Sequence, residues 1–468
     1  MHLIPASWAH LHILASVFPS VGLIFALGFY VAAMRLHSET KRRACLFVFA
    51  GIGLLTLPTY FSGVGSMVKL AANPKFSPDL MDLHAAWAWV GLFFLALTGI
   101  AAMITLWRSW KKPAISEDAL HLVLGLALLT LLVVCIVAWN GWDIAHRELR
   151  FAPIEGKTPQ IWSHIHIILN HFTTVGFVFA LFFFITGIIT KTDAMKRAAY
   201  VALVICGILG APTFVTGSSA MWALTDPPVA GITKAVINAH RDFAIFSLFG
   251  LAATGAAAWI EIWRYRYSGT FSKTSTWLIL ALAFITLALM AETGHRGGQI
   301  NHPEILVATD HLRTNADIGV AQRTEILINN VIWFVPWQTI HFFGYTLVFA
   351  TVLAVTMRIF GLWKSIPFSA IHRILPIGVF GVMMNVFTGM LMLMADTFRY
   401  VNEPAFWPKM MFLPIGAIAV LYFSLSDKLW AVKAGEDAPI KAKWVAALVL
   451  FSWTTVIMGG RLLPYITL

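Results

Sequence analysis

The chain has 468 residues, of which 59% are hydrophobic and only 12% are charged. Soluble globular proteins carry about 25% charged residues, so this composition excludes an ordinary soluble domain and indicates a protein that the lipid bilayer solvates. The formal net charge of +11 is high enough to suggest nucleic-acid binding. The placement of the positive charges, described below, gives a simpler explanation and argues against a nucleic-acid partner.

Twelve stretches of the sequence are long and apolar enough to cross a membrane as helices. A hydrocarbon core about 30 Å thick needs roughly 20 apolar residues in a helix. We expect the helices near residues 13–34, 45–68, 84–107, 119–139, 166–190, 198–222, 240–263, 275–293, 331–357, 372–395, 409–426 and 444–463. The sequence therefore predicts an all-α integral membrane protein.

The positive charges gather in alternate loops. Of the 33 Lys and Arg residues, 20 fall in the loops of one side, among them Arg42, Lys112 and Lys196. Loops rich in Lys and Arg face the cytoplasm, so both termini are expected on the periplasmic side of a bacterial inner membrane. No Lys or Arg precedes the first apolar stretch, so we expect that stretch to be a helix of the mature protein rather than a signal peptide.

An internal repeat covers the first two thirds of the chain. Residues 8–27 align with residues 162–181 at an offset of 154, and the same offset brings Gly63 onto Gly217. After a two-residue insertion the offset becomes 156, and His84 aligns with His240. A match of this length at a nearly constant offset predicts two copies of one structural unit.

Three four-helix membrane units are expected. Residues 1–160 form the first unit, residues 161–325 its repeat, and residues 326–468 a divergent third unit. Four helices return the chain to the side on which it began, so the first two units should be parallel, related by rotation about an axis near the membrane normal. The polar segment 301–330 is the expected external linker.

Histidines mark the expected outer ends of the helices in both copies of the repeat. The aligned positions are His10 with His164, His12 with His166, His84 with His240, and His146 with His302. Neutral imidazole is a good axial ligand of haem iron, and helix bundles hold cofactors between facing helices. We therefore predict that His12 with His84, and His166 with His240, ligate b-type haem, giving one or two haems per chain.

Several neighbouring residues are secondary candidates for the same cofactors. His146, His302 and His171 are expected as alternative ligands, or as hydrogen-bond partners of a haem propionate or a quinone. Arg147, Arg241 and Arg296 adjoin the histidines, and a guanidinium group neutralises a propionate through charge-assisted hydrogen bonds.

The third unit provides an internal comparison. It keeps the helices but, of the aligned histidines, retains only His341, and its third helix begins with Trp407-Pro408-Lys409. Histidines are thus not needed for the fold itself. This contrast favours a ligand role for them over the alternative that they merely lie among the lipid headgroups.

Motifs in the first two units resemble those of a known family. His12 to Pro19 and His166 to Phe172 resemble the opening His-Pro-x-x-Val-His-Phe-Pro of an uncharacterised bacterial four-helix membrane family. The segment Gly297 to His302 is similar to its closing Gly-Gly-x-Leu-Val-Tyr-x-His-Gly. Val17 departs from the pattern where the second copy keeps His171, so a haem that depended on this second histidine would occupy only the second unit.

The third unit resembles a different uncharacterised bacterial four-helix membrane domain. The resemblance is carried by Asp396-x-x-x-Tyr400-x-Asn402, which follows a helix with Thr388-Gly389. Both resemblances imply a fold, and neither implies an activity.

The leading functional prediction is a membrane-embedded electron-transfer subunit with b-type haem. It would link a periplasmic cytochrome or other redox subunit with the quinone pool, with quinone as a further ligand. Without a nucleotide-binding motif or a nucleophile triad in its sequence, the chain is expected to be a subunit of a membrane complex rather than a free-standing enzyme.

Two other functions remain open. One is the transport or handling of copper or another metal, because thioethers select Cu(I) and methionines are frequent in one helix, at Met383, Met384, Met390, Met392 and Met394. The other is a structural membrane subunit without a cofactor.

Cysteine labelling in intact cells tests the topology. In a chain whose native cysteines are replaced by serine, Lys157→Cys should react with a membrane-impermeant maleimide, because its loop is expected outside. Lys112→Cys should react only after permeabilisation, since the positive-inside rule places its loop in the cytoplasm. The reverse pattern would contradict the predicted orientation.

Overall fold

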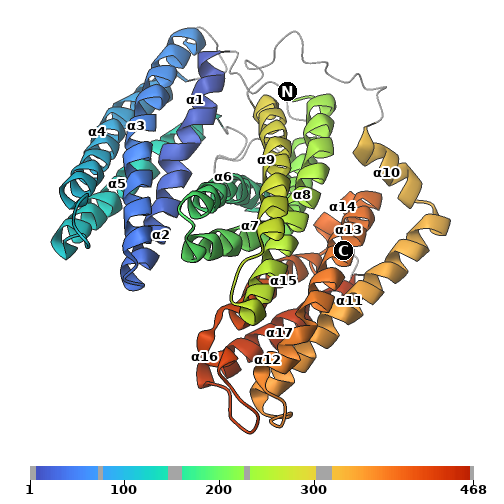
Figure 1. Ribbon diagram of the computed structural model, residues 1–468. Coiled ribbons are helices and arrows are strands. Elements are labelled where there is room, and N and C mark those ends of the chain that lie inside the picture. The colour runs from blue at the N-terminus through green and yellow to red at the C-terminus, as the bar shows by residue number, and fades with distance from the viewer. Residues whose placement is uncertain (1–6, 72–76, 146–160, 226–231, 302–318, 464–468) are drawn as a thin grey trace. The chain divides into compact units, whose positions relative to one another are not determined.

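The computed structural model describes residues 7–71, 77–145, 161–225, 232–301 and 319–463 (Figure 1). Helices make up most of these ranges, and no strand occurs within them. Twelve of the described spans are long and apolar enough to cross a membrane. The predicted all-α membrane fold is therefore confirmed.

The long helices follow one another along the chain. They are α1 (Trp8–Val17), α2 (Leu23–Arg35), α3 (Glu39–Leu70), α4 (Pro78–Ser109), α5 (Glu117–Ala145), α6 (Ile161–Ile189), α7 (Asp193–Thr225), α8 (Lys234–Ser268), α9 (Lys273–Asn301), α11 (Val331–Phe360), α13 (Leu375–Ala395), α15 (Phe406–Leu425) and α17 (Ile440–Leu462). Four short helices lie between them: α10 (Val320–Ile328), α12 (Phe368–Ile371), α14 (Thr397–Asn402) and α16 (Asp427–Trp430). Helix α10 shows that part of the expected linker 301–330 is helical; residues 302–318 lie outside the described ranges.

The first membrane span is interrupted near its middle. Helices α1 and α2 are joined by a π-helical turn, Phe18–Gly22, with Pro19 near its start. Proline has no backbone N–H and crowds the preceding turn of a helix, and a π turn accommodates such a break without ending the span. One span therefore appears as two helices in Figure 1.

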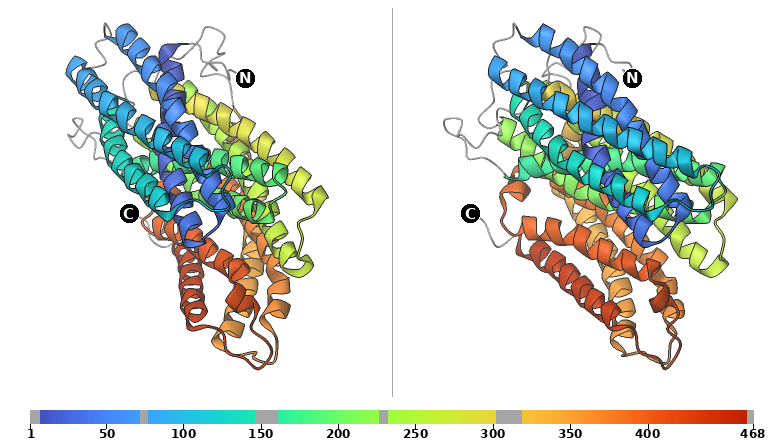
Figure 2. Two further views of the ribbon diagram at one scale, coloured as in Figure 1. Left: turned by 60° about the vertical axis from the view of Figure 1, so that its left-hand side comes forward. Right: turned by 90° about the vertical axis from the view of Figure 1, so that its left-hand side faces the viewer.

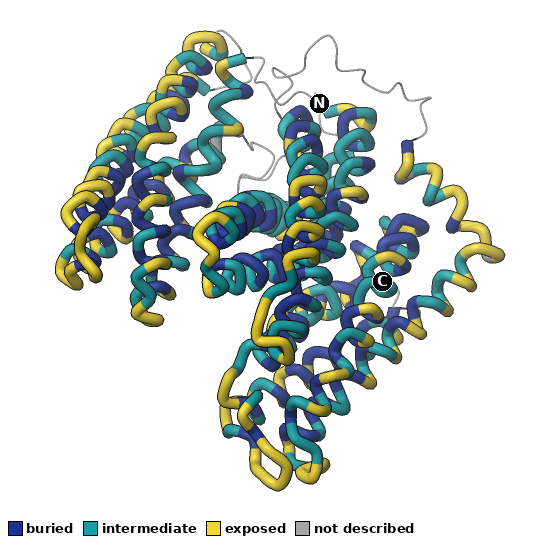
Figure 3. Tube along the Cα trace, in the orientation of Figure 1, coloured by how far each residue is buried: buried dark blue, intermediate teal, exposed yellow. Residues whose placement is uncertain are grey.

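Large apolar side chains cover much of the helix surface. Phe61, Phe93 and Leu132 are each more than half exposed, and exposed positions recur along the sides of the helices as well as in the loops (Figure 3). In water such a surface would favour aggregation. In a bilayer it is the surface that lipid tails contact.

By contacts the chain divides into two compact units. The first comprises residues 1–164, 174–179 and 294–312, and the second comprises residues 165–173, 180–293 and 313–468. Within the first unit α3 packs against α1, α2 and α4, and α4 packs against α5. Figure 2 shows these helices lying side by side. The grouping into three four-helix units remains a prediction.

Glycines allow two pairs of helices to approach closely. A Cβ atom on Gly53 of α3 would lie 3.0 Å from the Cα atom of Gly99 of α4. In the second unit a Cβ atom on Gly207 of α7 would lie 3.1 Å from Gly255 of α8. Small residues at helix crossings are typical of membrane bundles, since packing rather than water drives helix association there. The aligned positions of the sequence repeat thus make equivalent contacts.

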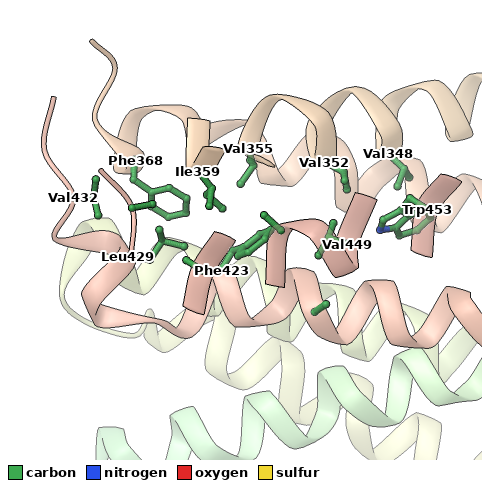
Figure 4. Packing of buried hydrophobic residues seen from close by; sticks show 14 residues of the cluster. Val348, Val352, Val355, Ile359, Phe368, Phe423, Leu429, Val432, Val449 and Trp453 are labelled. Carbon is green, nitrogen blue, oxygen red and sulfur yellow. The ribbon is translucent and has the colours of Figure 1, made fainter. Parts of the chain in front are cut away.

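The C-terminal helices of the second compact unit enclose an apolar core. Figure 4 shows Val352 and Ile359 of α11 facing Phe423 and Val449. At the end of this core the guanidinium group of Arg358 is fully buried. It donates hydrogen bonds to the carbonyl oxygens of Ile366, Lys433 (3.0 Å) and Glu436 (3.2 Å), so one side chain ties two loops to α11.

Replacing Arg358 should destabilise the second compact unit, which contains residues 313–468. Arg358→Leu leaves buried carbonyl groups without their donor, so we expect the free energy of unfolding to fall by at least about 2 kcal/mol. Lys364→Met is the control, because its ion pair with Asp437 is exposed and should contribute little to stability. Denaturant unfolding in detergent measures both, and equal effects would contradict this role of Arg358.

Candidate functional site

The structure brings together the histidines of both expected pairs. The rings of His12 on α1 and His84 on α4 have centroids 6.3 Å apart and planes inclined by 79°. The rings of His166 on α6 and His240 on α8 have centroids 6.5 Å apart and planes inclined by 75°. All four rings are half-buried. Each pair lies within one compact unit, and the two pairs share the same geometry.

Each of the four rings is held by the backbone of a neighbouring helix. Nδ1 lies within hydrogen-bond distance of one carbonyl oxygen in every case: His12 with Thr59 at 2.9 Å, His84 with Val137 at 3.1 Å, His166 with Thr213 at 2.9 Å, and His240 with Thr293 at 2.9 Å. A carbonyl oxygen only accepts, so Nδ1–H must donate. A neutral ring bound in this way carries its lone pair on Nε2, the arrangement usual for metal-ligating histidines.

Glycines provide the space for these rings. A Cβ atom on Gly63 would lie 2.9 Å from the ring of His12, and one on Gly217 would lie 2.7 Å from the ring of His166. A Cβ atom on Gly141 would lie 3.1 Å from the ring of His84. In these three cases the glycine follows the accepting carbonyl by four residues, and Gly297 follows Thr293 by the same spacing. In the three cases with a measured contact, the ring edge formed by Cε1 and Nδ1 therefore lies against the facing helix, in the space that a side chain would otherwise fill.

Sequence reasoning identified the histidines but not the groups that position them. The signal was present, because Thr59 aligns with Thr213, and Gly63 with Gly217, at the offset that relates the histidines. A glycine repeated together with a histidine, as Gly63 and Gly217 are with His12 and His166, indicates room for a ring beside the helix backbone. A carbonyl itself has no sequence signature, since every residue has one.

Helices α11 and α13 keep half of this arrangement. His341 lies 47 residues before Thr388, the same spacing as between His12 and Thr59 and between His166 and Thr213. Here Nδ1 contacts the Thr388 hydroxyl at 2.8 Å instead of a carbonyl. Helix α15 begins near Lys409, whereas α4 and α8 carry His84 and His240 near their starts, so no second imidazole faces His341 from that position.

Another histidine contact joins residues far apart in the sequence. His10 and His295 are both buried, with ring centroids 5.0 Å apart and a hydrogen-bond distance of 3.3 Å between Nε2 of His10 and Nδ1 of His295. The side-chain amide of Gln299 lies 3.0 Å from Nε2 of His295. The sequence repeat did not predict this contact, because the two positions do not align.

The remaining candidates have varied surroundings. Nδ1 of His171 lies 2.6 Å from the carbonyl oxygen of Ile167 in its own helix. Arg241 forms an ion pair with Glu325 at 3.8 Å, which compensates part of its charge. Arg296 is half-buried on α9. His146, Arg147 and His302 lie outside the described residues.

Each pair offers two ligands to a metal. In the described part of the chain no group of three or more His, Cys, Asp or Glu side chains could hold a metal ion. Metal sites built by protein alone take three or four such ligands, whereas a haem leaves two axial positions for side chains. Two facing imidazoles are therefore the donor set that suits haem iron.

Comparison with known proteins identifies one family. Residues 163–304 match the model of a predicted membrane protein family, DUF2231. The match lies within the expected second unit and supports the resemblance to an uncharacterised membrane family. No curated protein and no solved structure matches the chain.

Alanine substitutions test whether the glycines beside the histidine rings are needed to make room for them. Gly217→Ala places a methyl group against the ring of His166, and overpacking of this kind should lower the free energy of unfolding by about 1–3 kcal/mol. Gly125→Ala meets no atom within 4 Å and should raise it by about 0.5–1 kcal/mol, since alanine stabilises a helix relative to glycine. Denaturant unfolding of both variants checks the opposite signs.

Proposed function

We propose that the chain is an electron-transfer subunit of the membrane, with one b-type haem held by His12 and His84 and another by His166 and His240. The observation that carries the proposal is that both pairs of rings face each other at nearly the same spacing, each ring bound through Nδ1. Two sites with one geometry in two copies of a repeat indicate a shared ligand rather than chance packing.

The spacing of the rings would allow each pair of imidazoles to hold one iron between them. An imidazole nitrogen lies about 1.1 Å from its ring centre, and a metal–nitrogen bond is about 2.0–2.1 Å long. Two collinear bonds therefore separate the ring centres by about 6.2–6.4 Å. The spacing of 6.3 Å between His12 and His84 falls within this range, and the spacing of 6.5 Å between His166 and His240 lies 0.1 Å above it.

The surrounding residues fix the chemistry of the ligands. The hydrogen bonds from Nδ1 hold each imidazole in the tautomer whose Nε2 can bind a metal, and they increase the basicity of that nitrogen. When bound, a haem with two imidazole ligands accepts and donates single electrons. The glycines keep the rings close to the helix backbones, which limits their rotation and maintains the distance between each pair.

The position of the pairs suits exchange with a partner on the outer side. His12 and His166 lie within the first two turns of α1 and α6, and His84 and His240 within the first two turns of α4 and α8. These helix ends are the ones that the charge distribution assigns to the periplasm. We therefore assign the partner as a periplasmic cytochrome or another redox subunit of a membrane complex.

Absorption spectra of histidine variants test the haem assignment. The purified chain should show a reduced b-haem spectrum with two haems per chain. His84→Ala and His240→Ala should each remove about half of the haem, because each destroys one of two sites. His341→Ala should leave the content unchanged, since that ring faces no second histidine.

The same preparation separates the alternative functions. Wild-type haem content in both His84→Ala and His240→Ala would contradict the ligand assignment. A chain without haem that binds Cu(I) would favour metal handling, and one that binds neither would favour a structural subunit.

A further inference from the structure

A cavity of about 190 Å³ lies inside the second compact unit. Its wall is formed by α7, α8, α11, α13, α15 and α17, and most of its lining is apolar, including Val215, Leu248 and Val352. Its polar lining residues include His341, Tyr345, Asn385, Lys409 and Trp453. An apolar pocket with a few convergent polar groups is typical of a small-molecule site.

Three polar atoms at this cavity are buried without a hydrogen-bond partner among the described residues. They are the hydroxyl oxygen of Tyr345, Oδ1 of Asn385 and Nε1 of Trp453. The Asn385 amide nitrogen donates to the carbonyl oxygen of Gly381 at 3.0 Å. The amide oxygen, Oδ1, is therefore the atom of this side chain that a ligand could pair with. Burying a polar atom unpaired is unfavourable, so a ligand that pairs with these atoms would gain affinity.

These polar groups lie close together. The ring centroids of His341 and Tyr345 are 6.1 Å apart, and those of Tyr345 and Trp453 are 6.4 Å apart. Asn385 packs beside Gly344, where a Cβ atom would lie 2.8 Å from its amide nitrogen. Figure 4 shows Trp453 beside Val348, another residue of the lining. One small ligand can therefore contact several of these groups.

The hydrogen bonds of Thr388 determine the role of His341. The Thr388 hydroxyl donates to the carbonyl oxygen of Met384 at 2.7 Å, so it accepts from Nδ1–H of His341. The neutral ring then has an acceptor nitrogen, Nε2. The cavity thus combines the donors Tyr345, Trp453 and Lys409 with two acceptors, Oδ1 of Asn385 and Nε2 of His341.

We infer that this cavity binds the ring of a membrane quinone. The inference rests on the proposed electron-transfer function, which needs a lipid-soluble electron carrier. Quinone carbonyls accept hydrogen bonds and quinol hydroxyls also donate them, so a set of donors and acceptors binds both forms. An apolar cavity of about 150 Å³ holds one benzene molecule, so a cavity of about 190 Å³ has room for one substituted ring.

The site lies near the second histidine pair along a shared helix. Leu248 lines the cavity and follows His240 on α8 by about 12 Å along the helix axis, at about 1.5 Å per residue. Val215 also lines the cavity. It lies two residues after Thr213, whose carbonyl oxygen accepts the hydrogen bond from His166. The helices that position this pair therefore also form part of the cavity wall.

Equilibrium binding of a benzoquinone with a decyl tail to the full chain in lipid nanodiscs tests the inference. Tyr345→Phe and Trp453→Phe should each raise the dissociation constant about 5- to 10-fold, because each removes one hydrogen-bond donor. Tyr200→Phe is the matched control: its buried hydroxyl bonds to Thr276, and it does not line the cavity. The control should bind quinone as the wild type does.

Unfolding measured without quinone tests whether the Tyr345 hydroxyl contacts the ligand or instead stabilises the fold. Tyr345→Phe should keep or raise the unfolding midpoint, because the hydroxyl it removes has no partner among the described residues, whereas Tyr200→Phe should lower it. No saturable binding by the wild type, equal affinity in the wild type and both cavity variants, or tighter binding of dodecanoate than of quinone would each overturn the inference.

Measuring the haem content of the same preparation distinguishes a failure of the quinone site from a failure of the haem assignment. A chain with two haems that fails to bind quinone overturns only the quinone site. A chain without haem whose quinone affinity falls in Tyr345→Phe overturns only the haem assignment.

Discussion

Inside a bilayer every polar group must find its partner within the protein, because lipid tails neither donate nor accept hydrogen bonds. The backbone meets this constraint by forming helices. Side chains meet it in two ways: hydroxyls such as those of Thr56 and Thr213 bond back to carbonyls one turn earlier, and the paired histidines bond to carbonyls of a neighbouring helix. The second solution also connects helices, and it is the one on which the candidate site depends.

The sequence predicted the fold class well because hydropathy and helix length respond directly to the thickness of the bilayer. It also paired His12 with His84 and His166 with His240, because these aligned positions lie at the same ends of adjacent membrane helices, and the rings of each pair do face each other. The interruption at Pro19 and the helix within the expected linker depend on local backbone geometry, which periodic hydropathy does not resolve.

The cavity of the second compact unit could not be predicted in the same way. It depends on which faces of α7, α8 and α13 meet, and a uniformly apolar helix gives little indication of the face it buries. Among the methionines of α13, Met390 and Met394 are buried and Met383, Met390 and Met392 line the cavity. Their spacing alone did not distinguish packing from metal binding.

The close glycine contacts have a consequence for how the histidine pairs are controlled. His12 is bonded to α3, α3 meets α4 at Gly53 and Gly99, and α4 carries His84, so the two imidazoles are joined through a series of three helices. Gly53 lies about 15 Å along α3 from Gly63, the glycine beside His12. The spacing of the rings thus depends in part on a helix contact remote from them, and a small change in how α3 and α4 cross would alter the distance between the two imidazoles while every residue around the rings stayed the same.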